Sequence, residues 1–551
     1  MGAMIARLFV VVGMAISMRR LLRFLNSKDA EAVGFFTMNT KNSFRKTVTT
    51  GIIMGLILLT NLACQAAEKF NADPNQQLPK PDVKAPDTTK PVILPAAEIH
   101  LAQGILAGEV TATSAILQTR LTSVTSLTDG DVPGTAGTGR FEIAPAPDFK
   151  DARQTPWLQA TAAGDFILRA QVDGLRPSTT YHYRVVYGAD TDATRRSDPA
   201  SFKTLPDPRQ PAAVNFIFTN CLNYAFFHDG TKDIPAYRGA DRMLGYPALE
   251  PLRRLEPDFV IFGGDCVYYD HPEATRAKTL TELRKKWHEQ YVQPRFVQLF
   301  ARVPTYWMKD DHDYRMNDSD PTGDYEPSHQ LGIDTFREQV PVVKPDDPKA
   351  VTYRTHRMGR DLQLWFVEGR DYRSPNKMPD GPGKSIWGAE QKAWLQRTLK
   401  ESDATFKILV SPTPMIGPDD AYKRDNHVNE AGFRHEGEAF FAWLKANGIA
   451  SNRFFIICGD RHWKYHSQHA SGYEELSCGA HNRENSRLGR NPGDPKSTDP
   501  QAEVLQFYTD KTACGGFMRV ALTPGAAGRP AKLEFSQHDD QGKVLHRHEV
   551  Q

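Results

Sequence analysis

From residue 214 onward, short apolar runs alternate with longer stretches of helical periodicity, and most of the runs end in a polar loop. Six runs are predicted to be strands: 214–219, 259–262, 304–308, 362–367, 406–410 and 454–458. Three stretches between them are predicted to be helical: 279–300, 388–399 and 436–447. This alternation is typical of α/β folds, which build ligand sites at the carboxyl ends of their strands. The polar loops are therefore expected to meet at one site.

The segment 96–208 has an all-β pattern instead. Strand-like runs at 114–120 and 166–172 are separated by turn residues. A Leu-x-Pro sequence at 175–177 leads into a tyrosine-rich run that begins at Tyr181. This arrangement resembles the tyrosine corner of fibronectin-type sandwiches, whose buried phenol bonds back to the backbone. We therefore expect a small fibronectin/Ig-like β-domain in this segment.

The N-terminal region has the pattern of an export signal. Residues 38–67 combine a basic start, an apolar run at 51–59 and small residues suited to cleavage. The apolar run is shorter than the roughly 20 residues that cross a bilayer, and the Pro-rich linker 68–95 that follows it argues against a buried helix. We expect export to the periplasm, the cell surface or the medium, with Met38 as the true start. A lipid anchor at Cys64 is the alternative.

Charge and cysteine content narrow the function classes. A formal net charge of +2, from 68 basic and 66 acidic residues, gives no sign of a nucleic-acid-binding or basic membrane-binding surface. Signal cleavage would leave five of the six cysteines, so at least one thiol has no disulfide partner within the chain. Cys221, directly after the first strand, is the thiol that we expect to bind metal. Cys266 and Cys458 are interpreted as packing residues, whereas a Cys478–Cys514 pair stays open.

Three strand-end loops carry candidate metal ligands. Asp265 and Tyr268 lie three residues apart; a carboxylate can bridge two cations, and a phenolate suits a ferric ion better than zinc. The loop 310–313 places three carboxylates beside an imidazole, and such crowding is costly unless a cation compensates it. Asp460 and His462 follow the last strand with one residue between them. For each loop alone, helix capping, packing or a solvated acidic loop is the alternative.

Two of these loops, and the loop after the strand 362–367, carry groups suited to catalysis on phosphate. His312 is a reasonable general acid, because an ordinary histidine titrates close to neutral pH. Arg370, Arg373 and Arg461 could each recognise phosphate oxygens through two hydrogen bonds. Solvation at the surface is the alternative for these arginines, and only one or two of them are expected to contact substrate.

Taken in order, these motifs resemble the alkaline phosphatase D (PhoD-like) branch of the calcineurin-like metallophosphoesterases. They are the Cys221 loop, Gly-Asp-x-x-Tyr at 264–268, Asp-Asp-His-Asp at 310–313 and Gly-Asp-x-His at 459–462, with further similarity at 369–373 and 387–395. The resemblance implies an α/β fold over 212–551, a metallophosphoesterase-type β-sandwich flanked by helices, preceded by the all-β domain. Asp313 in place of Glu, Glu368 in place of Asp, and a loop at 411–414 without histidine depart from the pattern.

The resemblance also implies a metal centre that contains Fe(III) and Ca(II). One ferric ion would be bound by Cys221, Asp265 and Tyr268. Asp460 or His462 would complete its ligands.

One or two calcium ions would share Asp265 as a bridging ligand, with Asp311 in the position of the usual Asn. Asp310 belongs to the same predicted metal site, and Asn317 is a further candidate ligand. In this reading His312 becomes the proton donor or a phosphate contact.

The predicted function is hydrolysis of phosphate mono- or diesters by an exported, monomeric alkaline phosphatase or phosphodiesterase. Its predicted catalytic residues are His312, Arg373 and Arg461. A phospholipase D-like phosphodiesterase is one alternative, and a non-catalytic surface binding module is another. Against the second, every strand-end loop keeps residues that can bind metal. The natural substrate and the ligands of the second metal stay open.

Overall fold

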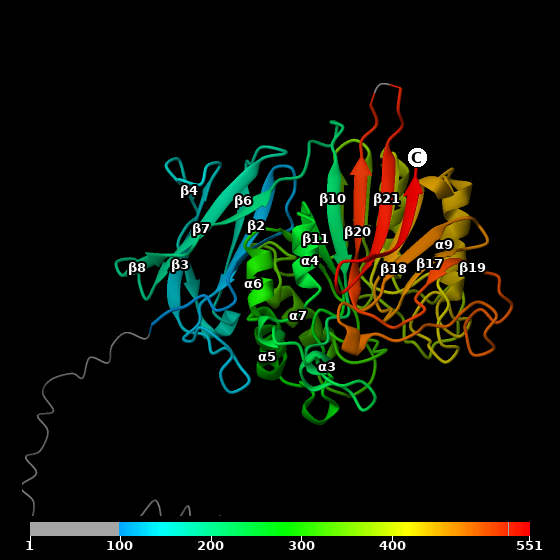
Figure 1. Cartoon of the computed structure of the whole chain (residues 1–551), viewed down its shortest axis with the longest axis horizontal. Helices are drawn as coiled ribbons and strands as arrows, with labels where there is room; N and C mark the ends of the chain where they lie inside the picture. Colours follow the sequence, from blue (N-terminus) through cyan, green and yellow to red (C-terminus); the bar gives the residue numbers. More distant parts are fainter. Residues whose placement is uncertain (1–97, 527) are drawn as a thin grey trace, which may run out of the picture. The chain divides into compact units, whose positions relative to one another are not determined.

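The computed structural model describes residues 98–526 and 528–551 (Figure 1). The predicted signal peptide at 38–67 and the predicted linker at 68–95 lie outside the described residues. Within the described part of the chain, no helix combines the length and the apolar character needed to cross a membrane.

Two large β-sheets form the centre of the α/β region. The nine-stranded sheet has the order β22 (Val544–Val550), β21 (Lys532–Asp539), β20 (Gly516–Thr523), β10 (Val214–Thr219), β11 (Phe259–Gly263), β12 (Thr305–Met308), β1 (Ile105–Gly108), β2 (Ser114–Arg120) and β6 (Ile167–Asp173). The seven-stranded sheet has the order β13 (Arg354–Met358), β14 (Leu362–Phe366), β15 (Phe406–Ser411), β16 (Phe454–Cys458), β18 (Glu474–Cys478), β17 (Lys464–Gln468) and β19 (Leu505–Thr509). Strands β10 to β12 are parallel neighbours, as are β14 to β16, so each set presents its carboxyl ends at one edge.

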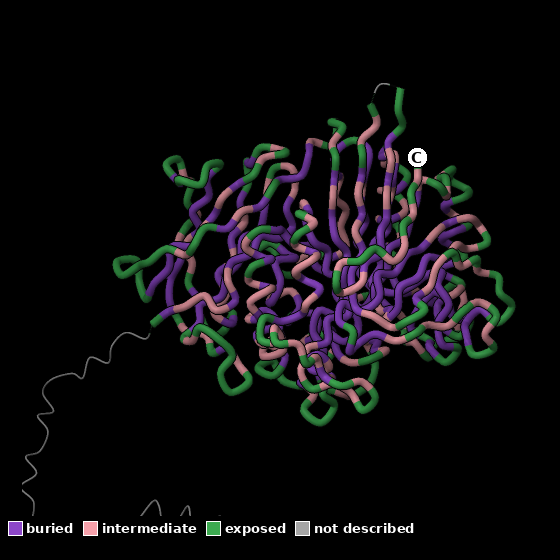
Figure 2. Tube along the Cα trace, in the orientation of Figure 1, coloured by how far each residue is buried: buried purple, intermediate pink, exposed green. Residues whose placement is uncertain are grey.

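Successive side chains along these strands point to opposite faces of the sheet and so enter different apolar cores. On β10, Phe216 and Phe218 belong to the apolar core between the two sheets, whereas Ile217 belongs to the core under the helices. Both faces of the central strands are therefore buried, as the buried colour along them shows (Figure 2). This explains why the strands read as continuous apolar runs in the sequence.

Helices cover the outer face of each sheet. The nine-stranded sheet packs against α4 (Leu249–Arg254), α5 (Leu280–Tyr291), α6 (Pro294–Phe300) and α7 (His329–Gln339). The seven-stranded sheet packs against α8 (Gly388–Glu401) and α9 (Arg434–Ala446). The short helix α3 (Tyr224–Asp229) follows β10, and Asn223 caps its N-terminus.

The predicted α/β fold is confirmed, with one correction among the helices. Strands β10 and β16 coincide with the predicted runs, and the other four predicted strands differ by one residue at one end. The stretch 279–300 is two helices, not one. Thr279 and Glu282 form a capping box at the start of α5. Pro294 begins α6, because proline lacks the N–H that would continue the earlier helix but is favoured at a first helical position.

The predicted all-β domain is a sandwich whose second sheet contains β4 (Arg153–Gln154), β3 (Gly137–Ala144), β7 (Thr180–Gly188) and β8 (Thr194–Arg196), with β5 (Leu158–Ala160) and β9 (Ala200–Lys203) paired to its members. Its core lies between this sheet and β1, β2 and β6. The tyrosine corner is confirmed, because the backbone N–H of Arg176 donates to the phenol oxygen of Tyr181 at 3.0 Å. Gly108 of β1 pairs with Thr305 of β12, so one sheet runs from the β-domain into the α/β region.

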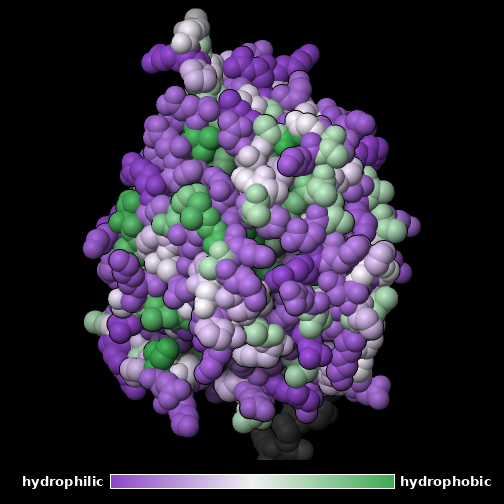
Figure 3. All heavy atoms as spheres, turned by 90° about the vertical axis from the view of Figure 1, so that its right-hand side faces the viewer, coloured by the Kyte–Doolittle hydropathy of each residue, from purple (hydrophilic) through white to green (hydrophobic). Residues whose placement is uncertain are grey.

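The face drawn in Figure 3 has a mixed surface. Hydrophobic residues lie in small groups that hydrophilic residues separate from one another. Such scattered apolar groups are ordinary on a folded protein, so this face carries no large apolar patch.

Candidate active site

The loops that follow β10, β11, β12 and β16 meet at one place, as the strand order predicts. The backbone N–H of Cys221 donates to the carbonyl of Gly264 at 3.2 Å, which joins the first two loops. A Cβ atom on Gly459 would lie only 2.6 Å from the carbonyl oxygen of Gly263. Glycine at 459 therefore lets the loop after β16, from one sheet, approach β11 in the other.

Three of the predicted ligands have a left-handed backbone. The φ angles are 55° at Cys221, 53° at Asp265 and 63° at Asp460. Non-glycine residues adopt this conformation at a cost on the order of 1 kcal/mol each, and such residues cluster at functional sites. In each case the sharp turn comes within three residues of a strand end.

Cys221, Asp265, Tyr268 and His462 form the first half of the site. The thiol of Cys221 and the phenol of Tyr268 each lie 3.4 Å from the same oxygen, Oδ2 of Asp265. One ligand atom from each of Cys221, Asp265 and His462 lies within 4.8 Å of the others. The side-chain amide of Asn485 donates to the phenol oxygen of Tyr268 at 2.8 Å and fixes its position.

The second half of the site is a group of carboxylates around Asp311. Three sets of ligand atoms within 4.8 Å contain Asp311: with Asp265 and His312, with Asp310 and Asp460, and with Asp318 and Asp425. Oδ2 of Asp310 and Oδ1 of Asp425 are buried and have no hydrogen-bond partner. Buried, unpaired carboxylate oxygens at this density are what hard cations require as ligands.

Burial shifts the titration of these groups toward their neutral forms. It raises the pKa of Cys221, Asp265 and Tyr268 well above their usual values, and neighbouring anionic groups add to the effect. Burial also raises the pKa of Asp460 to about 6. A bound cation reverses this preference, because it stabilises the deprotonated ligands. The donor set therefore fits a metal centre.

Asp313 has a structural role in the same loop. Its two carboxylate oxygens accept hydrogen bonds from the backbone N–H groups of Asp310, at 2.7 Å, and Cys266, at 2.9 Å. Asp313 therefore holds the loop after β12 against the loop after β11. Its carboxylate faces the backbone rather than the groups around Asp311.

The three predicted arginines occupy different environments. Arg370 is fully buried, and it donates to Asp310 at 2.6 Å and to Asp425 at 3.2 Å, so it compensates protein carboxylates. Arg373 is buried beside Phe433 and lies outside the lining of the site cavity. Arg461 lines the cavity; its Nη1 lies 2.6 Å from Asp460, whereas its Nε and Nη2 have no partner.

His312 is held by a carboxylate that the sequence analysis missed. Its Nδ1 lies 2.7 Å from Oδ1 of Asp270, and its ring stacks on Tyr268 with centroids 4.2 Å apart. Burial alone would lower the pKa of His312, but Asp270, Asp311 and Asp265 raise it well above its usual value. The contact with Asp270 orients the ring of His312 as a proton donor requires.

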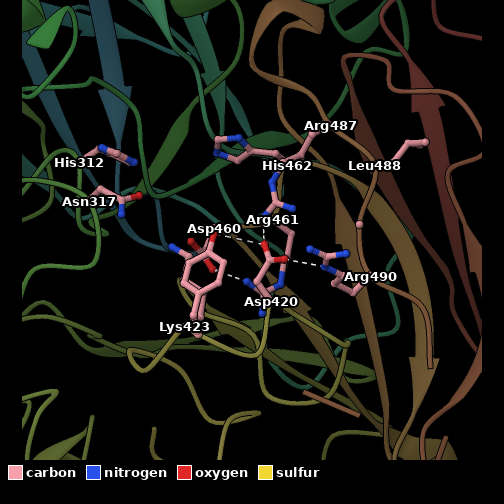
Figure 4. A pocket seen from close by; sticks show the side chains of 12 residues that line it. His312, Asn317, Asp420, Lys423, Asp460, Arg461, His462, Arg487, Leu488 and Arg490 are labelled. Atoms are coloured by element: carbon pink, nitrogen blue, oxygen red, sulfur yellow. Dashed lines mark hydrogen bonds and ion pairs between the residues drawn. The ribbon is translucent and has the colours of Figure 1, made fainter. Parts of the chain in front are cut away.

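The site opens into a cavity of about 510 Å³. In Figure 4, His312 and Asn317 lie on one side of it, and Arg487, Leu488 and Arg490 lie on the other. Lys423 lines the cavity between them, and Asp425, Asp460, Asp318 and Asp311 raise its pKa against the opposing effect of burial.

Six residues near the centre that the structure brings into contact with it were not predicted: Asp270, Asp318, Lys423, Asp425, Asn485 and Arg487. Apart from Asn485, they lie in irregular loops, some of them distant in sequence from the strand-end motifs. The high density of acidic residues at 310–324 is the one sequence signal that could have indicated Asp318.

Comparison with known proteins agrees with this geometry. A family model described as PhoD-like phosphatase matches residues 216–490, and one described as PhoD-like phosphatase, N-terminal domain, matches residues 88–206. Alkaline phosphatase D of Bacillus subtilis (strain 168) is 21% identical over 476 residues, which covers 76% of this chain and 75% of that protein.

Two solved structures share the fold. A structure of PhoD has a TM-score of 0.62 and 18% identity, and the match covers 81% of this chain and 88% of that one. Purple acid phosphatase PPD1 from yellow lupin (Lupinus luteus) seeds has a TM-score of 0.53 and 12% identity, over 83% of this chain and 75% of that one.

The two family matches cover both the β-domain and the strand-end loops that build the site. The metallophosphoesterase fold and the clustered metal ligands agree with them. The chain is a phosphoesterase hydrolase, and it belongs to the PhoD-like phosphatase family.

Proposed function

We propose that this hydrolase is an exported alkaline phosphatase or phosphodiesterase that works with one ferric ion and one or two calcium ions. One observation carries the choice of iron: a thiol and a phenol, Cys221 and Tyr268, both face Oδ2 of Asp265 at 3.4 Å. Thiolate and phenolate donors together suit Fe(III), and they are unusual for a site that holds only calcium.

The carboxylates around Asp311 would hold calcium. Asp265 would be shared between iron and calcium, and Asp310, Asp311 and Asp460 offer oxygen ligands within 4.8 Å of one another. The cations would neutralise charge on the phosphate oxygens and activate water. The unpaired Oδ2 of Asp310 supports this assignment, because a buried carboxylate oxygen without a partner is otherwise costly.

The protein itself supplies the proton and part of the positive charge. His312, oriented by Asp270, would donate a proton to the leaving alkoxide. Lys423 and Arg461 line the cavity and would bind the equatorial oxygens of the phosphoryl group. A cavity of about 510 Å³ has room for an organic group beside the phosphate, which supports an ester of an organic alcohol as substrate.

Metal content and colour test the proposal. The purified mature protein should contain iron and calcium by elemental analysis, and it should be violet through phenolate-to-iron charge transfer. Tyr268→Phe should lose the colour. Asp265→Asn should lose both metals and activity on p-nitrophenyl phosphate, because its carboxylate serves both ions.

Asp148→Asn, an exposed change in the β-domain, is the matched control and should keep metals, colour and activity. Comparison of p-nitrophenyl phosphate with bis-p-nitrophenyl phosphate, before and after calcium chelation, would rank the monoester and diester activities. Colourless, iron-free protein with full turnover would remove iron from the proposal. Full activity in Asp265→Asn would contradict the site itself.

Export is a separate part of the proposal and rests on residues 38–67. A fusion of these residues to a reporter that is active only outside the cytoplasm should give signal. A reporter that stays inactive, with the fusion protein intact in the cytoplasm, would contradict export.

A further inference from the structure

A second group of metal-binding side chains lies outside the strand-end loops, where strand β22 of one sheet meets β17 and β18 of the other. Ligand atoms of His466 on β17, Glu474 on β18 and His548 on β22 lie within 4.8 Å of one another. The side chain of His466 is 2% exposed, that of Glu474 15% and that of His548 24%. The group is therefore mostly enclosed and still within reach of ions in solution.

The carboxylate of Glu474 faces two imidazoles with one oxygen. Its Oε2 lies 3.0 Å from Nε2 of His466 and 2.9 Å from Nε2 of His548. Its other oxygen accepts a hydrogen bond from Gln468 at 3.2 Å, which orients the group. Elsewhere in the described part of the chain, no carboxylate has two histidines within ion-pair distance, so this is more than a common histidine–carboxylate pair.

Two further observations indicate that a metal ion, rather than protons alone, would hold these side chains together. Nε2 of His548 is buried and makes no hydrogen bond of good geometry, although Glu474 lies nearby. Nδ1 of His466 lies 3.2 Å from Nε2 of His546. If that Nδ1–H donates to His546, His466 presents the lone pair of its Nε2 to the centre of the group, as metal-binding histidines commonly do.

We propose that His466, Glu474 and His548 bind a divalent cation of the zinc class, and that His546 orients His466. Two imidazoles and one carboxylate are a ligand set that suits Zn²⁺, and they leave a fourth position for water. The ion would join the C-terminal strand β22, an edge strand of the nine-stranded sheet, to the interior strands β17 and β18 of the seven-stranded sheet. None of these four residues lines the catalytic cavity, and the group shares no ligand with the groups around Asp265 and Asp311, so the site is separate from the catalytic centre.

Zinc binding by matched variants tests the proposal. The purified mature protein, with its catalytic metals in place, is incubated with Zn²⁺ and desalted, and the retained zinc is measured by elemental analysis. His466→Ala and His548→Ala should each retain one zinc equivalent fewer than the wild type. His546→Ala should bind zinc about 10- to 100-fold more weakly in competition with a chromophoric chelator, as expected for a residue that orients a ligand.

His469→Ala is the control, because His469, directly after β17, pairs with a single carboxylate, that of Glu438 on α9, at 3.1 Å. This variant should keep the wild-type zinc content and the wild-type rise in Tm on addition of zinc. Zinc bound at the catalytic centre is common to all the proteins and cancels in the comparison. Phosphatase activity and iron content should be the same throughout, which shows that each variant folds.

If His548→Ala fails to fold, His548→Gln at this partly exposed position replaces it. Equal zinc retention by the wild type and the folded ligand variants would overturn the proposal. So would a loss of zinc in His469→Ala as large as that in His466→Ala. If the proposed function is wrong, the iron and calcium contents or the phosphatase activity will differ from those expected. The difference in zinc between the wild type and the ligand variants would still be seen.

Discussion

Replacing Asp270 with Asn tests whether His312 is a proton donor whose charge the neighbouring carboxylate maintains. Nδ1 of His312 lies 2.7 Å from Oδ1 of Asp270, and the backbone N–H of Asn317 donates to the other carboxylate oxygen at 3.0 Å. Asn keeps the size of the side chain and removes its charge. The protonated ring of His312 therefore loses stabilisation, while the metal-binding residues stay as they are.

The magnitude follows from the lost charge. A hydrogen bond to a charged group contributes about 1.5–3 kcal/mol. Removing this stabilisation lowers the pKa of His312 by the equivalent amount, so that above the variant's pKa the protonated fraction, and kcat with it, falls about 10- to 150-fold. Burial alone would lower the pKa of His312, and Asp270 leads the groups that raise it. Without Asp270 the pKa falls, the donor loses its proton at lower pH, and the alkaline limb of the kcat profile moves to lower pH.

The assay compares leaving groups. p-Nitrophenolate departs without a proton, whereas an alkoxide needs one in the transition state. Asp270→Asn should therefore lose most of its kcat on alkyl phosphates and much less on p-nitrophenyl phosphate, with little change in KM. Iron and calcium contents should equal those of the wild type.

Asp131→Asn is the matched control. Oδ1 of Asp131 lies 2.7 Å from Nδ1 of His288, the same geometry, but Asp131 belongs to the β-domain and His288 to α5. This variant should show no dependence on the leaving group. An equal loss on both substrates in Asp270→Asn, or an unchanged kcat on alkyl phosphates, would refute a proton-donor role for His312.

Three further predictions concern stability. Burial would raise the pKa of Asp165, but the histidine and arginine beside it lower that pKa to about 2. The carboxylate therefore contributes about 2 kcal/mol to the free energy of unfolding above pH 4, and this contribution is lost as pH falls toward 2. Urea unfolding of Asp165→Asn at a series of pH values should lack this loss of stability in acid. Arg370→Met leaves Asp310 and Asp425 buried without their guanidinium and should cost about 3–5 kcal/mol in urea unfolding; a loss below about 1 kcal/mol would contradict that reading. Chelation should lower Tm more at pH 8 than at pH 5, and Asp311→Asn should reduce this difference; an equal drop at both pH values would contradict it.

The strands were predictable because burial on both faces requires a continuous run of apolar residues, which is visible in the local sequence. The run 454–458 is entirely apolar or sulfur-containing, and β16 occupies the same residues. No local sequence pattern indicates the pairing of Gly108 with Thr305, because it joins residues almost 200 positions apart through two short strands. The sequence pattern therefore predicted the β-domain but not that its sheet continues into the α/β region.

The site divides in the same way. Residues one to five positions past a strand, such as Asp265 and Asp311, were predictable because the strand fixes where the chain emerges. Asp318, Lys423 and Asp425 lie in long irregular loops, whose path is set by contacts across the site rather than by local periodicity. Cys221 lies between these cases: the strand end predicted its position, whereas its interpretation as a metal ligand needed the odd number of thiols as a second argument.

The charges of the centre explain why bound metal should stabilise the folded protein more at alkaline pH than in acid. In the described part of the chain, six carboxylates belong to the ligand groups around Asp311, and only Arg370, Arg461 and Lys423 pair with them as permanent cations. Burial raises the pKa of Asp318 to about 7, and the neighbouring carboxylates of Asp425 and Asp311 add to the effect. A folded-state pKa above the unfolded value gives stability that is present at low pH and is lost as pH rises through about 7. In the metal-free centre, protons can therefore neutralise the carboxylate charge only in acid, whereas bound cations neutralise it at the higher pH at which the carboxylates are ionised.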